Sequence, residues 1–309
     1  MMSPGYTEPL YLLPFDHRHS YVSGMFHFSP PLTAEQHAQV ADSKQLIYEG
    51  FRLALVEGVN SQYAGILVDE EFGAAILQDA SRRGIITAMS TEQSGSDEFL
   101  FEYGADFARH IERFNPTFVK VLVRYNVEDD AEFNRRQRDR LKQLSAYCRS
   151  SARRFMFELL VPPTARQLKR VNGDQHAYDL ELRPELMRQA IFTLQDGGVE
   201  PDIWKVEGLD RREDCVRLVE AARRDGRDTV SCILLGRGAD MKKVSAWLET
   251  AASVDGFIGF AVGRTTFWDE VSAYQAKHVT RAEAAAGIAE RYRTWVNIFE
   301  RARVPRADS

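Results

Sequence analysis

The sequence predicts an α/β fold, a single (β/α)8 TIM barrel that takes in residues 1–309 as one domain. Eight short apolar runs, often β-branched, alternate with longer segments of helical composition, which is typical of repeated βα units. The chain has 309 residues, and barrels of this class routinely occupy about 250 residues or more as one unit. An open doubly wound sheet usually has fewer strands and a GxGxxG turn after the first one, and no such turn follows the first run.

The apolar runs are the predicted strands. In chain order they are LYLLPFD (10–16), AGILVD (64–69), GIITAM (84–89), FVKVLVRY (118–125), RFMFELL (154–160), DIWKVEG (202–208), TVSCILLG (229–236) and DGFIGFAVG (255–263).

Amphipathic stretches between the runs are predicted to cover the outer face of the sheet as helices. They include SKQLIYEGFRLALVEG (43–58), ADFARHIERF (105–114), EFNRRQRDRLKQLSAYCRSS (132–151), PELMRQAIFTLQDGG (184–198), REDCVRLVEAARRDG (212–226), MKKVSAWLETAAS (241–253) and the final helix TRAEAAAGIAERYRTWVNIFERAR (280–303). The last six residues, VPRADS, are expected to form a frayed tail.

Composition excludes several classes of function. The net charge is -5, from 40 basic and 45 acidic residues, and the arginines form no basic stripe, so neither nucleic acid nor a membrane is an expected partner. Three scattered cysteines without a CxxC pair argue against a disulfide framework and against structural zinc. The sequence has no basic, apolar N-terminal segment and no run of about 18 apolar residues, so we expect a cytoplasmic protein. Its expected partner is a small molecule, and a homo-oligomer is compatible with the sequence.

The strand DIWKVEG contains a lysine where a buried strand should carry apolar side chains. Side chains alternate between the two faces of a strand, so Trp204 and Val206 face the helices while Lys205 faces the barrel interior. Burying an ammonium is costly unless it is paired or loses its proton, and a neutral amine is a nucleophile. A shift of register by one residue would turn Lys205 outward and remove this argument. Lys205 is therefore the leading candidate for a functional residue.

Other polar residues are expected at the same mouth, because the carboxyl ends of the strands carry the active site in these barrels. The alternation places Lys120, Arg124 and Glu158 on the barrel face, and Asp16 ends the first strand. For Arg124, and for Asp69 and Glu207 at two further strand ends, solvation or pairing with a neighbour explains the charge equally well. His17 and His19 lie in a turn and stay outside the candidate catalytic set, and no histidine has the spacing of a metal ligand, so we expect no metal and no cofactor.

Two glycine-arginine pairs follow the seventh and eighth strands, in LLGRGAD and AVGRTTFWD. These two loops commonly hold a phosphate in (β/α)8 barrels through backbone N–H groups and a helix N-terminus. Glycine allows the backbone to approach an anion, and arginine binds phosphate in a bidentate manner. The pairs Gly236-Arg237 and Gly263-Arg264 therefore indicate a phosphorylated ligand.

The ordered set of strand-end motifs resembles a family of class I aldolases. The segments FDHR (15–18), ILVDEEFG (66–73), VKVLVRYN (119–126), FELL (157–160), WKVE (204–207), ILLGRG (233–238) and FIGFAVGRTTFWD (257–269) are similar to those of the aldolases related to tagatose 1,6-bisphosphate aldolase. The closest resemblance is to the 2-deoxy-5-keto-gluconate 6-phosphate aldolase domain of myo-inositol catabolism.

The resemblance implies roles for individual residues. Lys205 matches the Schiff-base lysine, Glu158 the carboxyl that moves a proton at the substrate hydroxyl, and Lys120 a second lysine whose charge favours the neutral form of the first. Asp16 and Arg18 match the family's Asp-Gln-Arg segment, in which His17 here replaces an amide. The implied reaction is cleavage of 2-deoxy-5-keto-gluconate 6-phosphate to dihydroxyacetone phosphate and malonate semialdehyde.

Two alternatives remain open at this stage. An aldolase for a tagatose or sulfo-fructose phosphate would keep the fold and Lys205 and change only the sugar. A non-catalytic barrel that senses a sugar phosphate would bind its ligand without forming a Schiff base, and ligand would then raise its thermal stability without any covalent adduct.

Overall fold

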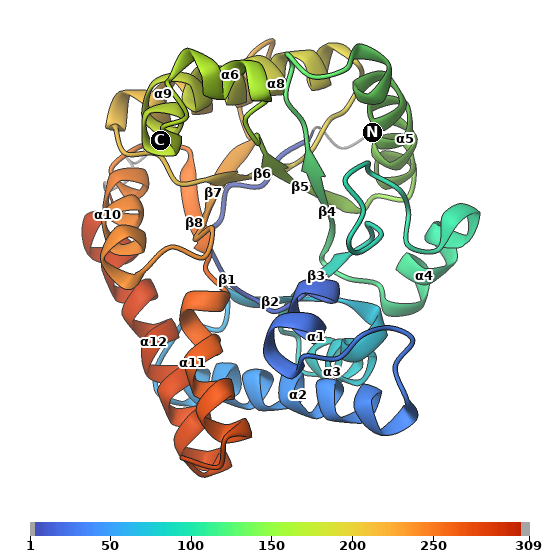
Figure 1. Cartoon of the computed structure of the whole chain (residues 1–309), viewed down its shortest axis with the longest axis vertical. Helices are drawn as coiled ribbons and strands as arrows, with labels where there is room; N and C mark the ends of the chain where they lie inside the picture. The colour runs from blue at the N-terminus through green and yellow to red at the C-terminus, as the bar shows by residue number, and fades with distance from the viewer. Residues whose placement is uncertain (1–3, 304–309) are drawn as a thin grey trace.

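Eight parallel strands close into a barrel in strict chain order, with β1 paired to both β2 and β8. The computed structural model describes residues 4–303, so residues 1–3 and the tail expected over 304–309 lie outside the described part. Viewed along the barrel, the strands form an inner ring and most of the helices an outer one (Figure 1). The predicted single (β/α)8 barrel is confirmed.

All eight predicted strands are present, with ends that differ from the predicted ones by at most two residues. They are β1 (Leu10–Pro14), β2 (Ala64–Val68), β3 (Ile86–Ser90), β4 (Phe118–Arg124), β5 (Arg154–Leu160), β6 (Ile203–Glu207), β7 (Ser231–Leu235) and β8 (Phe257–Ala261). The third strand begins two residues late because Gly84 adopts a positive φ of 67° in the turn before it.

The helices follow the predicted order, and further helices lie outside the predicted ranges, two of them 12 and 13 residues long. They are α1 (His19–Phe26), α2 (Ala34–Val56), α3 (Glu70–Arg82), α4 (Phe107–Phe114), α5 (Ala131–Ser150), α6 (Ala165–Arg170), α7 (Gln175–Ala177), α8 (Arg183–Asp196), α9 (Arg212–Arg223), α10 (Met241–Ala252), α11 (Arg264–Gln275) and α12 (Arg281–Ala302), with a 3₁₀ turn η1 (Gly104–Asp106) and a π turn η2 (Tyr178–Leu182). The second helix begins nine residues before the predicted start, because Thr33 and Gln36 form a capping box that satisfies its first N–H groups.

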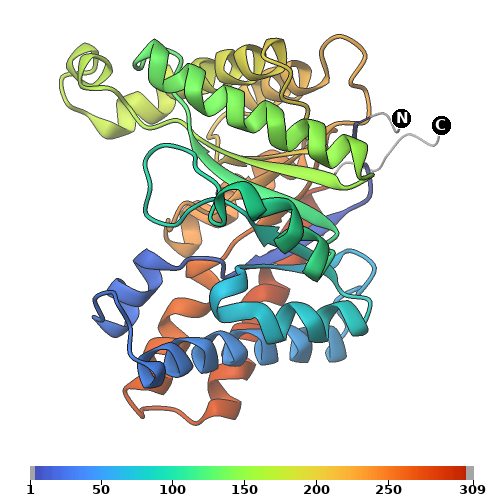
Figure 2. The same ribbon diagram turned by 90° about the vertical axis from the view of Figure 1, so that its right-hand side faces the viewer.

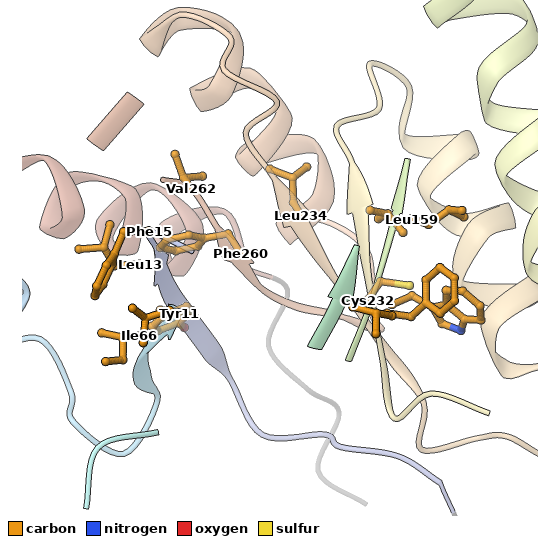
Figure 3. Packing of buried hydrophobic residues seen from close by; sticks show 14 of the residues in the cluster. Tyr11, Leu13, Phe15, Ile66, Leu159, Cys232, Leu234, Phe260 and Val262 are labelled. Carbon is orange, nitrogen blue, oxygen red and sulfur yellow. The ribbon is translucent and has the colours of Figure 1, made fainter. Parts of the chain in front are cut away.

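Two apolar layers hold the barrel together. The inner layer fills the barrel with side chains of Leu10, Leu12, Leu67, Ala88, Phe118, Met156, Ile203, Ile233, Ile258 and Ala261. The outer layer lies between strands and helices, and Figure 3 shows part of it around Tyr11 and Phe260, whose rings stack with centroids 5.4 Å apart. The last helix packs on this layer, where the Tyr292 hydroxyl donates to the carbonyl of Tyr11 at 2.7 Å.

The predicted alternation of strand faces is confirmed. Trp204 and Val206 belong to the outer layer, whereas Ile203 belongs to the inner one, so Lys205 faces the barrel interior. The alternative register, which would turn this lysine toward the helices, is excluded by that packing. Seen from the side, α1 and the segment between β3 and α4 lie at the same end of the barrel (Figure 2), and this end is its mouth.

The structure also answers the expectations about the cysteines and about membrane-spanning helices. The three cysteines, Cys148, Cys215 and Cys232, are buried free thiols, and burial raises the pKa of each to about 12. None of the helices within residues 4–303 combines the length and the apolar character needed to cross a membrane.

Candidate active site

Lys205 lies at the floor of the mouth, where only 3% of the residue is exposed. Its Nζ is 2.7 Å from Oε1 of Glu158. The two residues are direct register partners in the parallel strands β5 and β6, so both side chains leave the same face of the sheet at the same height. The barrel therefore brings the predicted lysine and the predicted carboxylate into contact.

Lys120, from β4, is surrounded by three carboxylates. Its Nζ lies 2.7 Å from Asp16 Oδ2, 2.8 Å from Glu92 Oε1 and 2.9 Å from Glu158 Oε2. Burial disfavours the ammonium, but the charges of Asp16, Glu158 and Glu92 outweigh burial and raise the pKa of Lys120 well above its ordinary value. This lysine is a fixed positive charge.

The pKa values of two carboxylates that contact these lysines shift downward, opposite to the shift of Lys120. For Glu158, burial raises the pKa, and the stronger combined effect of Lys120 and Lys205 brings it below its ordinary value. For Asp16, burial is likewise outweighed, by Lys120 and then Lys205, and the net result is a lowered pKa. Both groups are therefore anionic at neutral pH, and Glu158 bridges the two lysines.

Glu92 is a member of this cluster that sequence reasoning missed. It follows β3 by two residues and is held in place by an isolated antiparallel bridge to Phe101. Burial raises the pKa of Glu92, against the opposing effect of Lys120 and Arg18. The residue lies beyond the end of its strand, so strand alternation says nothing about its direction, although the rule that strand ends carry polar groups covers its position.

Arg18 lines the mouth, and both of its terminal nitrogens are engaged by the protein, whereas its buried Nε has no hydrogen-bond partner within residues 4–303. Nη1 donates to Glu102 Oε2 and Nη2 to the backbone carbonyl of Glu92, each at 2.5 Å. Oε2 of Glu102 also accepts from the backbone N–H of Ser94 at 3.0 Å. These contacts fasten the 91–102 segment to the end of β1, so Arg18 positions a wall of the mouth.

Two cavities meet at Lys205 and Glu158. The first, here called the distal cavity, has a volume of about 230 Å³ and lies against Asp16, Glu92, Lys120 and the 93–99 segment. The second, here called the loop cavity, has a volume of about 350 Å³ and is walled by the loops after β7 and β8. The reactive lysine candidate thus lies between two spaces of different chemical character.

The two loop arginines differ in what surrounds them. Arg237 is engaged by two carboxylates, with Nη1 2.7 Å from Asp179 Oδ2 and Nε 3.0 Å from Glu207 Oε1. Arg264, the first residue of α11, donates from Nη2 to Ser20 Oγ at 2.7 Å, and within residues 4–303 no carboxylate lies at ion-pair distance. Of the two, Arg264 is the arginine whose charge is available to an anion.

The loop cavity also offers backbone donors. Gly263 is the N-cap of α11, and a Cβ there would come within 2.3 Å of the Pro14 carbonyl oxygen, so only glycine fits. The first N–H groups of an α-helix lack intrahelical acceptors and carry the positive end of the helix dipole. Gly236 and Gly238 also line this cavity. The predicted phosphate-binding residues are therefore gathered in one cavity.

Two of the remaining polar candidates, Asp69 and Glu207, are accounted for by pairing, whereas Arg124 is exposed, lines both cavities and donates from Nη1 to the Ser96 carbonyl at 3.4 Å. Asp69 is fully buried, caps α3 through the N–H of Phe72 and forms an ion pair with buried Lys44. For Lys44, burial outweighs this partner and lowers the pKa. The pair lies behind the mouth and supports the fold.

His17 lines both cavities beside Lys205. Burial lowers its pKa to about 4, so the ring is neutral at neutral pH. In the part of the chain that the structure describes, no cluster of three or more His, Cys, Asp or Glu side chains has a geometry suited to a metal ion.

The chain forms a closed (β/α)8 barrel whose mouth holds two buried lysines, a bridging glutamate and a glycine-arginine loop cavity. This candidate site lies at the end of the barrel where the active sites of such folds are found. Comparison with solved structures agrees on the fold. The chain is similar to the fructose-bisphosphate aldolase of Plasmodium falciparum, solved in a ternary complex with TRAP and a small-molecule inhibitor, at a TM-score of 0.65 and 12% identity over 99% of both chains. It is also similar to Cgl0159 from Corynebacterium glutamicum, at a TM-score of 0.54 and 17% identity over 95% of this chain and 88% of that one.

Residues 4–303 match the family described as "Uncharacterized protein conserved in bacteria (DUF2090)", and the chain belongs to that family. Among curated proteins, no sequence matches the chain. At these identities the structural neighbours show a shared barrel fold, so the chemistry must be argued from the site itself.

Proposed function

We propose that the protein is a class I aldolase that cleaves a keto-sugar phosphate through a Schiff base on Lys205. The observation that carries the proposal is the buried contact of 2.7 Å between Lys205 Nζ and Glu158 Oε1 at the junction of two cavities. A nucleophilic amine next to a group that can take its proton is the arrangement that covalent catalysis requires.

The proposed reaction begins with proton transfer from Lys205 to Glu158. The neutral amine attacks the ketone carbon, and the resulting carbinolamine loses its hydroxyl as water, with the proton returned by Glu158, to give a protonated Schiff base. Glu158, again a carboxylate, then removes the proton of the hydroxyl on the carbon at the far end of the breaking carbon–carbon bond, so that this carbon becomes the aldehyde carbonyl. The electrons of that carbon–carbon bond move to the iminium nitrogen, so an aldehyde leaves and an enamine remains.

Glu158 returns the hydroxyl proton to the enamine carbon, and water hydrolyses the Schiff base to free the ketone product and Lys205. Lys120 and Asp16 support these steps as fixed charges, because the raised pKa of Lys120 and the lowered pKa of Asp16 keep both groups ionised throughout. Lys120 also holds the second carboxylate oxygen of Glu158 at 2.9 Å, which aims the first at Lys205.

The loop cavity is proposed to hold the phosphate of the ketone half. Arg264 supplies charge, the N-terminus of α11 and the glycines Gly236 and Gly263 supply backbone donors, and Arg237 is a positioned part of the wall. Arg18 contributes on the other side by holding the 91–102 segment. This division of the mouth gives the phosphate and the aldehyde half separate spaces.

For the substrate we propose 2-deoxy-5-keto-gluconate 6-phosphate, with dihydroxyacetone phosphate and malonate semialdehyde as products. The proposal rests on the resemblance of the strand-end motifs to the aldolase domain of myo-inositol catabolism. A cavity of about 230 Å³ next to Lys205 has room for the short three-carbon aldehyde half.

The test is covalent trapping. Wild-type protein incubated with dihydroxyacetone phosphate and sodium borohydride should gain the mass of one reduced adduct, and peptide mapping should locate it on Lys205. The Lys205→Ala variant should gain nothing, while Lys242→Ala, at an exposed lysine of α10, should react as wild type does. Thermal stabilisation by the phosphate without any adduct in the wild type would contradict the aldolase and favour a sugar-phosphate sensor.

A further inference from the structure

One oxygen in the mouth has no partner. Glu92 places Oε1 2.8 Å from the Lys120 ammonium, whereas its Oε2 is buried and has no hydrogen-bond partner in the described part of the chain. The residue is only 8% exposed and lines the distal cavity. A buried carboxylate oxygen without a donor is costly when charged, and the cost falls when the carboxyl carries a proton.

The charges of the mouth also favour one retained proton. Four carboxyls lie in the cluster, Asp16, Glu92, Glu102 and Glu158. Three cations face them, Arg18, Lys120 and Lys205. Carboxyls that share one site cannot all ionise easily, and the shortage of positive charge grows when Lys205 becomes a neutral nucleophile.

Glu92 is the member of the cluster best suited to keep that proton. Glu158 contacts two lysines, Asp16 contacts Lys120 at 2.7 Å, and Glu102 receives the Arg18 guanidinium at 2.5 Å. Glu92 contacts Lys120, which also pairs with Asp16 and Glu158, and its second cation, Arg18 Nη2, is 3.8 Å away. Burial raises the pKa of Glu92, while the pKa values of Asp16 and Glu158 are lowered.

We propose that Glu92 is protonated in the resting enzyme and donates a hydrogen bond from its free carboxyl oxygen to a hydroxyl or carbonyl oxygen of the aldehyde half of the substrate. The inference rests on the proposed aldolase function and assigns the distal cavity a specificity-determining residue. A site built to hydrogen-bond a substrate oxygen discriminates strongly against analogues that lack it, because its own polar group is then left unpaired.

The conservative variant Glu92→Gln distinguishes a protonated Glu92 from an ionised one. Glu92→Gln keeps a donor at the free position and an acceptor for Lys120, so kcat/KM for cleavage of 2-deoxy-5-keto-gluconate 6-phosphate should stay within about threefold of wild type, whereas Glu92→Ala should lose about 10- to 100-fold. A neutral donor is lost as pH rises through its pKa, so the alkaline fall of kcat/KM contributed by Glu92 should disappear in Glu92→Gln. The groups that face Glu92 and also titrate are Asp16, Glu102, Glu158, Lys120 and Arg18.

A second measurement detects the proton on Glu92 in the resting protein and does not depend on which substrate the enzyme uses. The infrared spectrum of wild type should contain the carbonyl stretch of a protonated carboxyl near neutral pH, and this band should be missing in Glu92→Gln. Borohydride trapping of dihydroxyacetone phosphate, which occupies the loop cavity, should be unchanged in both Glu92 variants.

The outcomes are distinct. If Glu92→Gln is as impaired as Glu92→Ala, or if the wild type lacks the band, Glu92 is an anionic counter-ion of Lys120 and the inference is wrong. If the wild type forms no adduct with dihydroxyacetone phosphate, the aldolase function itself fails and the substrate role of Glu92 fails with it. Retained trapping together with selective loss in Glu92→Ala supports both.

Discussion

Lys205 and Glu158 are register partners on adjacent parallel strands, and their side chains meet at 2.7 Å inside the barrel mouth. The contact follows directly from the sheet, because paired residues of neighbouring parallel strands project side chains on the same face. No loop has to fold over to create it. The central pair of the proposed mechanism is thus held by rigid elements, which keep reacting groups in a constant geometry.

The role of Glu158 predicts a large kinetic effect. Glu158→Gln should lower kcat for cleavage by about 10²- to 10⁴-fold, the usual contribution of a general acid or base. Since Lys120 and Lys205 lower the pKa of Glu158 against the effect of burial, the base stays ionised as pH falls. The acid limb of kcat/KM should therefore lie below about pH 4.3, the ordinary glutamate pKa.

Steady-state kinetics from pH 3.5 to 9, with circular dichroism to establish where the protein unfolds, checks this prediction. Glu249→Gln, at an exposed glutamate of α10, is the matched control and should behave as wild type. Full activity of Glu158→Gln would rule out a proton-transfer role for this residue.

The two loop arginines should respond differently to the same substitution. Arg264→Gln should raise KM for the phosphorylated substrate by about 10-fold or more, since a charge-assisted hydrogen bond contributes about 1.5–3 kcal/mol. Arg237→Gln should mainly lower the thermal stability, because it removes the partner of Glu207 and Asp179. Inhibition by inorganic phosphate, measured for both variants beside thermal unfolding, distinguishes them. A larger loss of phosphate affinity in Arg237→Gln would reverse the assignment.

Lys120→Met should destabilise the fold strongly. It leaves Asp16, Glu92 and Glu158 without their shared ammonium, and breaking a buried pair costs about 3–5 kcal/mol. The raised pKa of Lys120 means that its stabilisation is complete below about pH 10.4, the unfolded lysine pKa, and is lost only as pH rises through the higher folded value.

In the variant the buried carboxyls lose the lysine that lowered their pKa, so acid, which protonates them, should relieve part of the defect. Calorimetric unfolding should show a smaller loss of Tm at pH 5 than at pH 8, and Lys242→Met should show neither effect. An equal loss at both pH values would mean that the carboxylates are neutralised by other groups.

The buried pair behind the mouth predicts strong coupling between two mutations. Asp69→Asn keeps the cap of α3, because asparagine also accepts from the helix N–H groups, but leaves the Lys44 ammonium buried without its counter-ion. Each single change, Asp69→Asn or Lys44→Met, should cost about 3–5 kcal/mol of unfolding free energy. The double variant should cost clearly less than the sum, as urea unfolding of the four proteins would measure. Strict additivity would contradict a direct ion pair.

Much of the site was readable from local pattern. A strand has a side-chain period of two, so the flanking apolar residues Trp204 and Val206 were enough to turn Lys205 inward, and the same argument placed Lys120 and Glu158. The order of strands and helices defined the barrel and, with it, the end at which these side chains meet. Such inferences need only neighbouring residues and one general rule of the fold.

Partnerships across the barrel were decided by tertiary structure alone. Lys120 and Asp16 are 104 residues apart and meet only because the barrel closes between β8 and β1. Glu92 belongs to a segment without strand or helix period, held by Arg18 and Phe101, so no local pattern could direct its side chain. The sequence by itself determined which faces the strands present, because that is a property of the extended backbone; closure of the sheet decided which charges neutralise one another and which remain free for a ligand.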